Sequence, residues 1–218
     1  MEKAFRIGWG LIALSALIAI GAYAAWPGGS APVRFDTDGT PLAYGSAFVF
    51  FFFIPAAMIA TMIVMRFITR SEPARENLEK SSKAFMASLI GMLIVMILAQ
   101  LFGTAAAYGL WLPVPQLITT AAGLLLAVIG NYMPKARRNF TLGVRNRWTL
   151  SSDEIWQKTH RFSAPLMIIA GLAMIVLPWL MQFKMGVLLA VIAILGVATM
   201  SYVYSYCVWV QVGRPELN

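Results

Sequence analysis

Long apolar runs separated by short polar segments form the main pattern along the 218-residue chain. A helix needs about 20 apolar residues to cross about 30 Å of hydrocarbon, because each residue advances it by about 1.5 Å. Gln182 and Lys184 follow Pro178 and indicate a tight reversal between the last two runs. The pattern predicts an all-α fold, a polytopic membrane bundle of six transmembrane helices at 7–25, 47–65, 84–107, 116–133, 162–181 and 185–208.

The composition excludes an ordinary soluble domain. Residues of the AVILMFWYC set make up 60% of the chain and charged residues only 12%, whereas soluble domains carry about 25% charged residues. With one cysteine, the chain cannot be a disulfide scaffold. The six runs contain no Asp, Glu, Lys, Arg or His, which disfavours an ion-coupled carrier because such proteins use intramembrane ionisable groups.

The basic residues indicate how the chain is oriented. Of 17 Lys and Arg residues, only Arg34 and Lys184 fall in loops on one side; the other side includes the 134–161 loop and both termini. Basic residues favour the cytoplasmic side. We therefore expect a multi-pass membrane protein with both termini cytoplasmic and an extracellular loop at 26–46. Residues 1–25 resemble a signal peptide, but their apolar run of 19 residues favours a first span.

The sequence contains no recognisable catalytic constellation. There is one histidine, His160, and no zinc-protease, phosphate-loop or nucleophile-elbow motif. Asp36-x-Asp38-Gly39 resembles the start of a calcium loop, but the later ligands are missing and an Asp-Gly turn fits better. We therefore expect no enzyme activity, no metal and no cofactor. Gln100 and Asn131 place amides in or beside hydrocarbon, where each needs a partner or a polar cavity.

The 134–161 loop combines seven basic residues with aromatic ones. Such a segment favours contact with anionic lipid headgroups, while the irregular spacing of its charges gives no reason to expect direct nucleic acid binding. Ser151-x-x-Glu154 has the form of a capping box. It predicts a short interfacial helix that starts near Ser152, before span five, with Ile155, Trp156, Thr159 and Phe162 on one side.

Four motifs in and around this loop carry a family resemblance. They are Gly130-Asn131-Tyr132-Met133-Pro134-Lys135, Asn139-Phe140-x-x-Gly143-Val144-Arg145, Trp148-Thr149-Leu150-Ser151 and Trp156-x-Lys158-Thr159-His160-Arg161. Together they closely resemble the signature of the SdpI family of immunity proteins against the sporulation-delaying-protein toxin. The outer loop is similar to the small N-terminal domain that often accompanies this family, except that Arg34 stands where members commonly carry His. We accordingly divide the chain into a helical hairpin, 1–70, and an SdpI-like four-helix region, 71–218.

The resemblance implies a protein of the bacterial plasma membrane that protects a cell from an exported peptide toxin and also holds a cytosolic repressor at the membrane. The candidate residues of the motif loop are Asn131, Pro134, Lys135, Asn139, Gly143, Arg145, Trp148, Thr149, Trp156, Thr159 and His160. The candidate extracellular recognition residues are Arg34, Phe35, Asp36, Gly39 and Tyr44.

Two alternatives remain open at this point. Asn131, Asn139, Arg145 and Thr149 are also residues that would cap helix ends and fix the loop without contacting any partner. A small-molecule or lipid transporter with a cavity around Gln100 and Asn131 is the alternative function.

Overall fold

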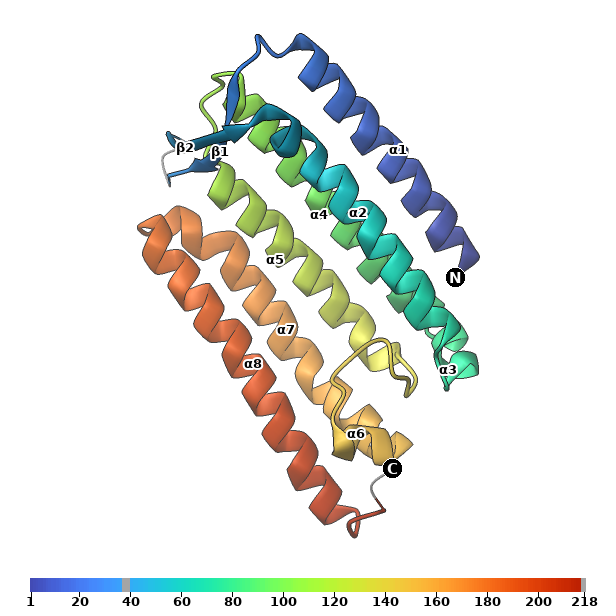
Figure 1. Ribbon diagram of the computed structural model, residues 1–218. Helices are drawn as coiled ribbons and strands as arrows, with labels where there is room; N and C mark the ends of the chain where they lie inside the picture. Colours follow the sequence, from blue (N-terminus) through green and yellow to red (C-terminus); the bar gives the residue numbers. More distant parts are fainter. Residues whose placement is uncertain (37–39, 217–218) are drawn as a thin grey trace.

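The computed structural model describes all residues except 37–39 and 217–218, and within them it is a bundle of long helices (Figure 1). Six of the described helices are long and apolar enough to cross a membrane, which confirms the predicted fold. Their bounds are α1 Glu2–Ala25, α2 Ala47–Arg70, α4 Ser82–Ala107, α5 Val114–Tyr132, α7 Asp153–Leu180 and α8 Phe183–Gln211. Only Met181 and Gln182 separate α7 from α8, so the tight reversal is also confirmed.

The helices pack in two connected groups. Helices α1, α2 and α4 share a core that includes Phe5, Met58 and Leu93. Helix α4 also contacts α5, which packs against α7, and α7 packs against α8. Gly123 and Gly171 bring α5 and α7 together, because a Cβ at either glycine would lie 2.6 Å from the carbonyl oxygen of the other. Small residues at a helix interface allow this close approach in membranes.

The bundle has two ends of different character. Helix α1 begins and α8 ends at the same end (Figure 1), which also carries α3 (Arg75–Lys80), the 3₁₀ turn η1 (Met133–Lys135), α6 (Arg147–Ser151) and the 136–146 loop between the last two. We call this the basic end. The opposite end, the hairpin end, carries strands β1 (Ser30–Phe35) and β2 (Pro41–Ser46) (Figure 1).

The two strands form an antiparallel hairpin in the predicted outer loop. Their register runs from the pair Ser30 and Ser46 to the pair Phe35 and Pro41, with irregularities on either side of Arg34. Val33 to Phe35 form the second half of β1. The predicted turn at Asp38-Gly39 lies outside the described residues.

The predicted capping box at Ser151 is wrong. Ser152 caps α7 by accepting from the Glu154 amide at 3.2 Å, whereas the Ser151 hydroxyl donates to the Trp148 carbonyl. The helix that starts here is not a separate interfacial one, since α7 runs unbroken to Leu180. The short helix before span five is instead α6, which ends at Ser151. At about 1.5 Å per residue, α7 is longer than the hydrocarbon is thick, and its first turns carry the charged residues.

Candidate functional site

The motif loop at the basic end is a fixed structure, and Asn139 holds its first turn. The Asn139 side chain is fully buried. Its amide nitrogen donates to the Arg137 carbonyl at 2.7 Å, and its oxygen accepts from the amides of Thr141 and Leu142 at 2.8 and 2.7 Å. Asparagine is suited to this task because its side chain imitates a backbone turn. Asn139 therefore shapes the loop from inside.

Trp156 and His160 form a buried stack between α7 and the loop. Their ring centroids lie 4.0 Å apart, and the Trp156 indole donates to the Ala136 carbonyl at 2.9 Å. His160 Nε2 accepts from the Val144 amide at 3.1 Å, so the proton of the neutral ring is on Nδ1, 2.8 Å from the Trp156 carbonyl. His160 is thus bonded to backbone at both nitrogens and makes no contact with Glu154, which pairs with Lys158 instead.

The stack of Trp156 and His160 leaves no room for a side chain at Gly143. Its φ is +107°, a conformation that favours glycine, and a Cβ there would lie 2.2 Å from His160 Nε2. The motif glycine therefore permits the loop backbone to pass directly over the buried histidine.

Helix α6 is capped and tied to α8. The side-chain oxygen of Asn146 accepts from the backbone amides of Trp148 and Thr149. The Thr149 hydroxyl accepts from the backbone amide of Asn146, which completes a capping box. The side-chain nitrogen of Asn146 donates to the Ser205 hydroxyl of α8 at 2.8 Å. Trp148 packs edge-on against Tyr202, also of α8, with centroids 4.7 Å apart. The sequence did not identify Asn146 as a cap, and the capping box that it predicted starts five residues later, at Ser151.

Glu72, between α2 and α3, is a second residue that sequence reasoning missed. It is only 6% exposed. Its carboxylate accepts from the Phe140 amide at 3.0 and 3.1 Å, from the Thr141 hydroxyl at 2.5 Å and from the Ala74 amide at 3.1 Å. Charge-assisted hydrogen bonds of this kind are the strong ones. Glu72 therefore joins the α2–α3 connection to the motif loop, 68 residues further on.

Most of the remaining motif candidates lie at or near the surface. Asn131, Lys135 and Arg145 are exposed, and Pro134 is half-buried. The Arg145 guanidinium donates to the Phe140 carbonyl, and the Lys135 ammonium lies 5.8 Å from the centre of the Tyr132 ring. Thr159 is buried, and its hydroxyl has no hydrogen-bond partner among the described residues. The motif thus supplies both buried residues that fix the loop and exposed ones that a partner can reach.

The five hairpin candidates are not gathered in one place. Arg34 and Tyr44 are exposed, Phe35 and Asp36 are half-buried, and Gly39 lies outside the described residues. Phe35 lines an apolar pocket of about 310 Å³ between the hairpin and helices α2, α4 and α5, with Phe50 and Gln100. The hairpin therefore covers one end of α2, α4 and α5.

Gln100 and Asn131 do not share a cavity. Gln100 accepts from the Ser15 hydroxyl at 2.5 Å and donates to the Ser15 carbonyl at 3.0 Å, so its amide joins α4 to α1. Asn131 is exposed at the other end of the bundle and does not line the pocket that contains Gln100. The arrangement satisfies the buried amide with a neighbouring helix, as expected for a polar group in hydrocarbon.

Comparison with known proteins agrees with the loop motifs. Residues 135–205 match the model of the SdpI/YfhL protein family. Over 167 residues the chain is 26% identical to the immunity protein SdpI of Bacillus subtilis (strain 168), a match that covers 77% of each chain. No solved structure matches the chain significantly. The family match does not extend to the hairpin, whose resemblance to an accompanying N-terminal domain stays a prediction. These two matches confirm the resemblance to the SdpI family that the loop motifs carry.

Proposed function

We propose that the protein is an integral membrane immunity protein that protects a bacterial cell from an exported antimicrobial peptide. The support is the match of residues 135–205 to the family and the name of the relative from Bacillus subtilis. The observation that carries the proposal is that the motif residues form one fixed loop, held by Asn139, His160 and Glu72 over the ends of α5 and α7.

In this proposal the hairpin end faces outward and meets the peptide. Two of the 17 basic residues lie at that end, as the positive-inside rule requires of an outer face. Arg34 and Tyr44 project their side chains from adjacent strands, and Tyr44 is 63% exposed. Exposed side chains of these two types suit peptide recognition, since Tyr and Arg are enriched among energetically dominant contacts.

The basic end would then face the cytosol and hold a repressor protein. Arg145 and Phe140 are exposed on the motif loop, and the bond between them fixes the guanidinium against the loop backbone. The loop is joined both to α7, through His160, and to the α2–α3 connection, through Glu72. A shift of α7, or of α2 and α3, on toxin binding would therefore move the surface that the repressor contacts.

The immunity proposal is tested by expressing the full chain in a peptide-sensitive bacterium and challenging it with purified toxin peptides of this class. We expect growth at toxin concentrations that stop the empty-vector strain. Arg34→Gln should lower the tolerated concentration about ten-fold, the loss typical of one important interface residue. Lys184→Gln is the matched control, because it removes the other basic side chain of the hairpin end. No protection by the unaltered chain, at confirmed membrane levels, would refute the immunity function.

The repressor proposal needs a separate measurement. A fluorescent fusion of a small helix-turn-helix protein encoded beside the gene should move to the membrane when toxin is added. Arg145→Gln should abolish this movement, whereas Arg147→Gln, at a neighbouring exposed arginine of α6, should not. If both variants recruit the fusion equally well, Arg145 does not belong to a docking surface.

A further inference from the structure

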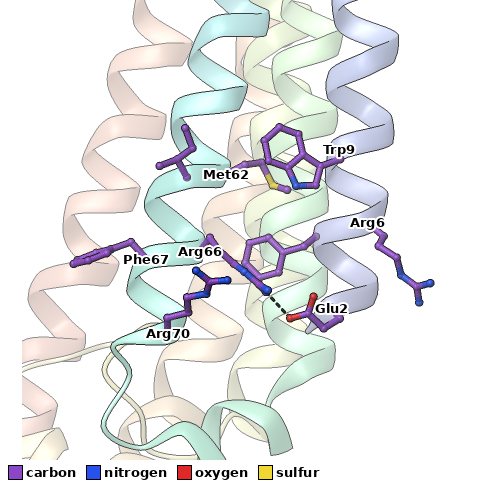
Figure 2. Close-up of a pocket in the computed structure, with 9 residues that line it drawn as sticks. Glu2, Arg6, Trp9, Met62, Arg66, Phe67 and Arg70 are labelled. Atoms are coloured by element: carbon purple, nitrogen blue, oxygen red, sulfur yellow. Dashed lines mark hydrogen bonds and ion pairs between the residues drawn. The ribbon is translucent and has the colours of Figure 1, made fainter.

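A groove between α1 and α2 at the basic end combines an apolar wall with a charged mouth (Figure 2). Its volume is about 520 Å³. The residues that line it are Glu2, Phe5, Arg6, Trp9, Met62, Ile63, Arg66, Phe67 and Arg70. Neither the motif loop nor the hairpin contributes to it, so it is distinct from both candidate sites described above.

The apolar wall runs along the membrane-facing side of the two helices. Met62 is 1% exposed and lies between the helices, while Trp9 is 49% and Phe67 72% exposed. In Figure 2, Trp9 and Met62 lie nearer the middle of the bundle than Arg66 and Arg70 do. The wall therefore extends from the charged mouth toward the depth at which lipid chains surround the helices.

The charged mouth has an excess of positive charge. Arg66 donates to Glu2 at 2.5 Å, and its guanidinium lies 4.8 Å from the centre of the Phe5 ring. Arg70, one turn further along α2, has no hydrogen bond or ion pair from its side chain within the described part of the chain. Arg6 also lines the groove, but in Figure 2 it points away from α2, the helix that carries Arg66 and Arg70. The single carboxylate of Glu2 cannot neutralise the charges of both Arg66 and Arg70.

We propose that this groove binds one anionic phospholipid, with its phosphate on Arg66 and Arg70 and an acyl chain along Trp9, Met62 and Phe67. Arginine presents several N–H donors in a planar fork that matches phosphate oxygens. A free phosphate would use only the mouth and leave the apolar wall unused. A phospholipid uses both halves, and the boundary between the halves lies where the helices leave their apolar runs, at the level of lipid headgroups.

The test uses the full chain reconstituted in phosphatidylcholine vesicles with increasing amounts of phosphatidylglycerol. Lipids with brominated chains quench tryptophans they touch, and subtracting the signal of Trp9→Phe isolates Trp9. We expect brominated phosphatidylglycerol to quench Trp9 at lower mole fractions than brominated phosphatidylcholine. Arg70→Gln should reduce this preference about five-fold, the effect of one basic residue at a membrane surface. Because the Arg70 side chain makes no hydrogen bond or ion pair within the described part of the chain, this variant should remain folded.

The matched control is Arg75→Gln, which removes the same charge at the same end but from α3, outside the groove. It should keep the preference for phosphatidylglycerol. An equal loss in both variants would reduce the effect to general surface charge and overturn the proposal. So would equal quenching by the two lipids. Millimolar inorganic phosphate should leave the quenching unchanged; if it abolishes the preference, the groove is an anion site that does not need a lipid.

Discussion

At the scale of single residues, the contact between Gly143 and His160 controls the shape of the motif loop. The imidazole stacks on Trp156 and accepts from the next loop amide, that of Val144, so the loop backbone has to pass within van der Waals distance of the ring. Only a residue without a Cβ fits there. The glycine of the motif is therefore explained by packing against the histidine of the same motif, 17 residues later.

Gly143→Ala should lower the free energy of unfolding by about 2 to 4 kcal/mol. Part of the loss is the strain of a side chain at positive φ, and part is the hydrogen bond to His160 Nε2 that the displaced loop gives up. Thermal unfolding in detergent micelles measures the effect. Gly196→Ala is the matched control, because a Cβ at Gly196 meets nothing within 4 Å and alanine favours the helix. A melting temperature of Gly143→Ala equal to that of the unaltered chain would contradict this account.

The same residues show what sequence reasoning could reach. The motifs identified Asn139, Thr149 and His160 as special, because such polar residues at fixed spacing are rare in a membrane chain. The sequence leaves the roles of Asn139 and Thr149 open between recognition and loop fixation, since a single sequence does not say whether a polar residue is buried. The structure buries all three and bonds each to backbone. Their effect on function stays a prediction.

At the scale of elements, the connection between α2 and α3 supports the motif loop through Glu72. In the sequence this glutamate is one of several charged residues in a short polar segment, and nothing in its neighbourhood marks it as buried. Its partners lie 68 and 69 residues away. Local patterns do not encode such a contact, which depends on how α2 and α4 place the connection beside α5.

Glu72→Gln should loosen the 136–146 loop. The amide keeps one acceptor but presents N–H groups to donors that now lack a partner, at a cost of about 1 to 3 kcal/mol. Arg137, Arg138 and Arg145 are trypsin sites in this loop, so the rate of tryptic cleavage there measures the loosening. We expect faster cleavage in Glu72→Gln than in Glu76→Gln, which changes an exposed carboxylate paired only with Lys80. Equal rates would show that the loop does not depend on Glu72.

Helix boundaries were predictable where hydrophobicity determines them and uncertain where capping does. The six spans and the reversal after Leu180 follow from apolar length alone. At the start of α7, Ser151 and Ser152 are both suitable caps, and sequence pattern favoured the wrong one. Helix α6 determines which serine caps α7. The Ser151 hydroxyl donates to the Trp148 carbonyl within the last turn of α6, so Ser152 is the serine that caps α7.

At the scale of the whole molecule, the start of α1, the end of α8, α3 and the motif loop share one end of the bundle, and the hairpin occupies the other (Figure 1). Of the 17 basic residues, only Arg34 and Lys184 belong to the hairpin end. The proposed partners are therefore divided between the two ends, with the toxin at the hairpin end and the repressor and anionic lipid at the basic end. All three assignments depend on which end faces the cytosol.

That orientation is tested with single cysteines in a Cys207→Ser background, since Cys207 is the one native thiol. Leu42→Cys labels β2 at the hairpin end, and Arg147→Cys labels α6 at the basic end; both side chains are exposed. The charge bias predicts that a membrane-impermeant maleimide reacts with Leu42→Cys in intact cells. It should react with Arg147→Cys only after the membrane is permeabilised. The reverse pattern would place the hairpin in the cytosol, where an exported toxin could not meet it, and the immunity proposal would fail with the topology.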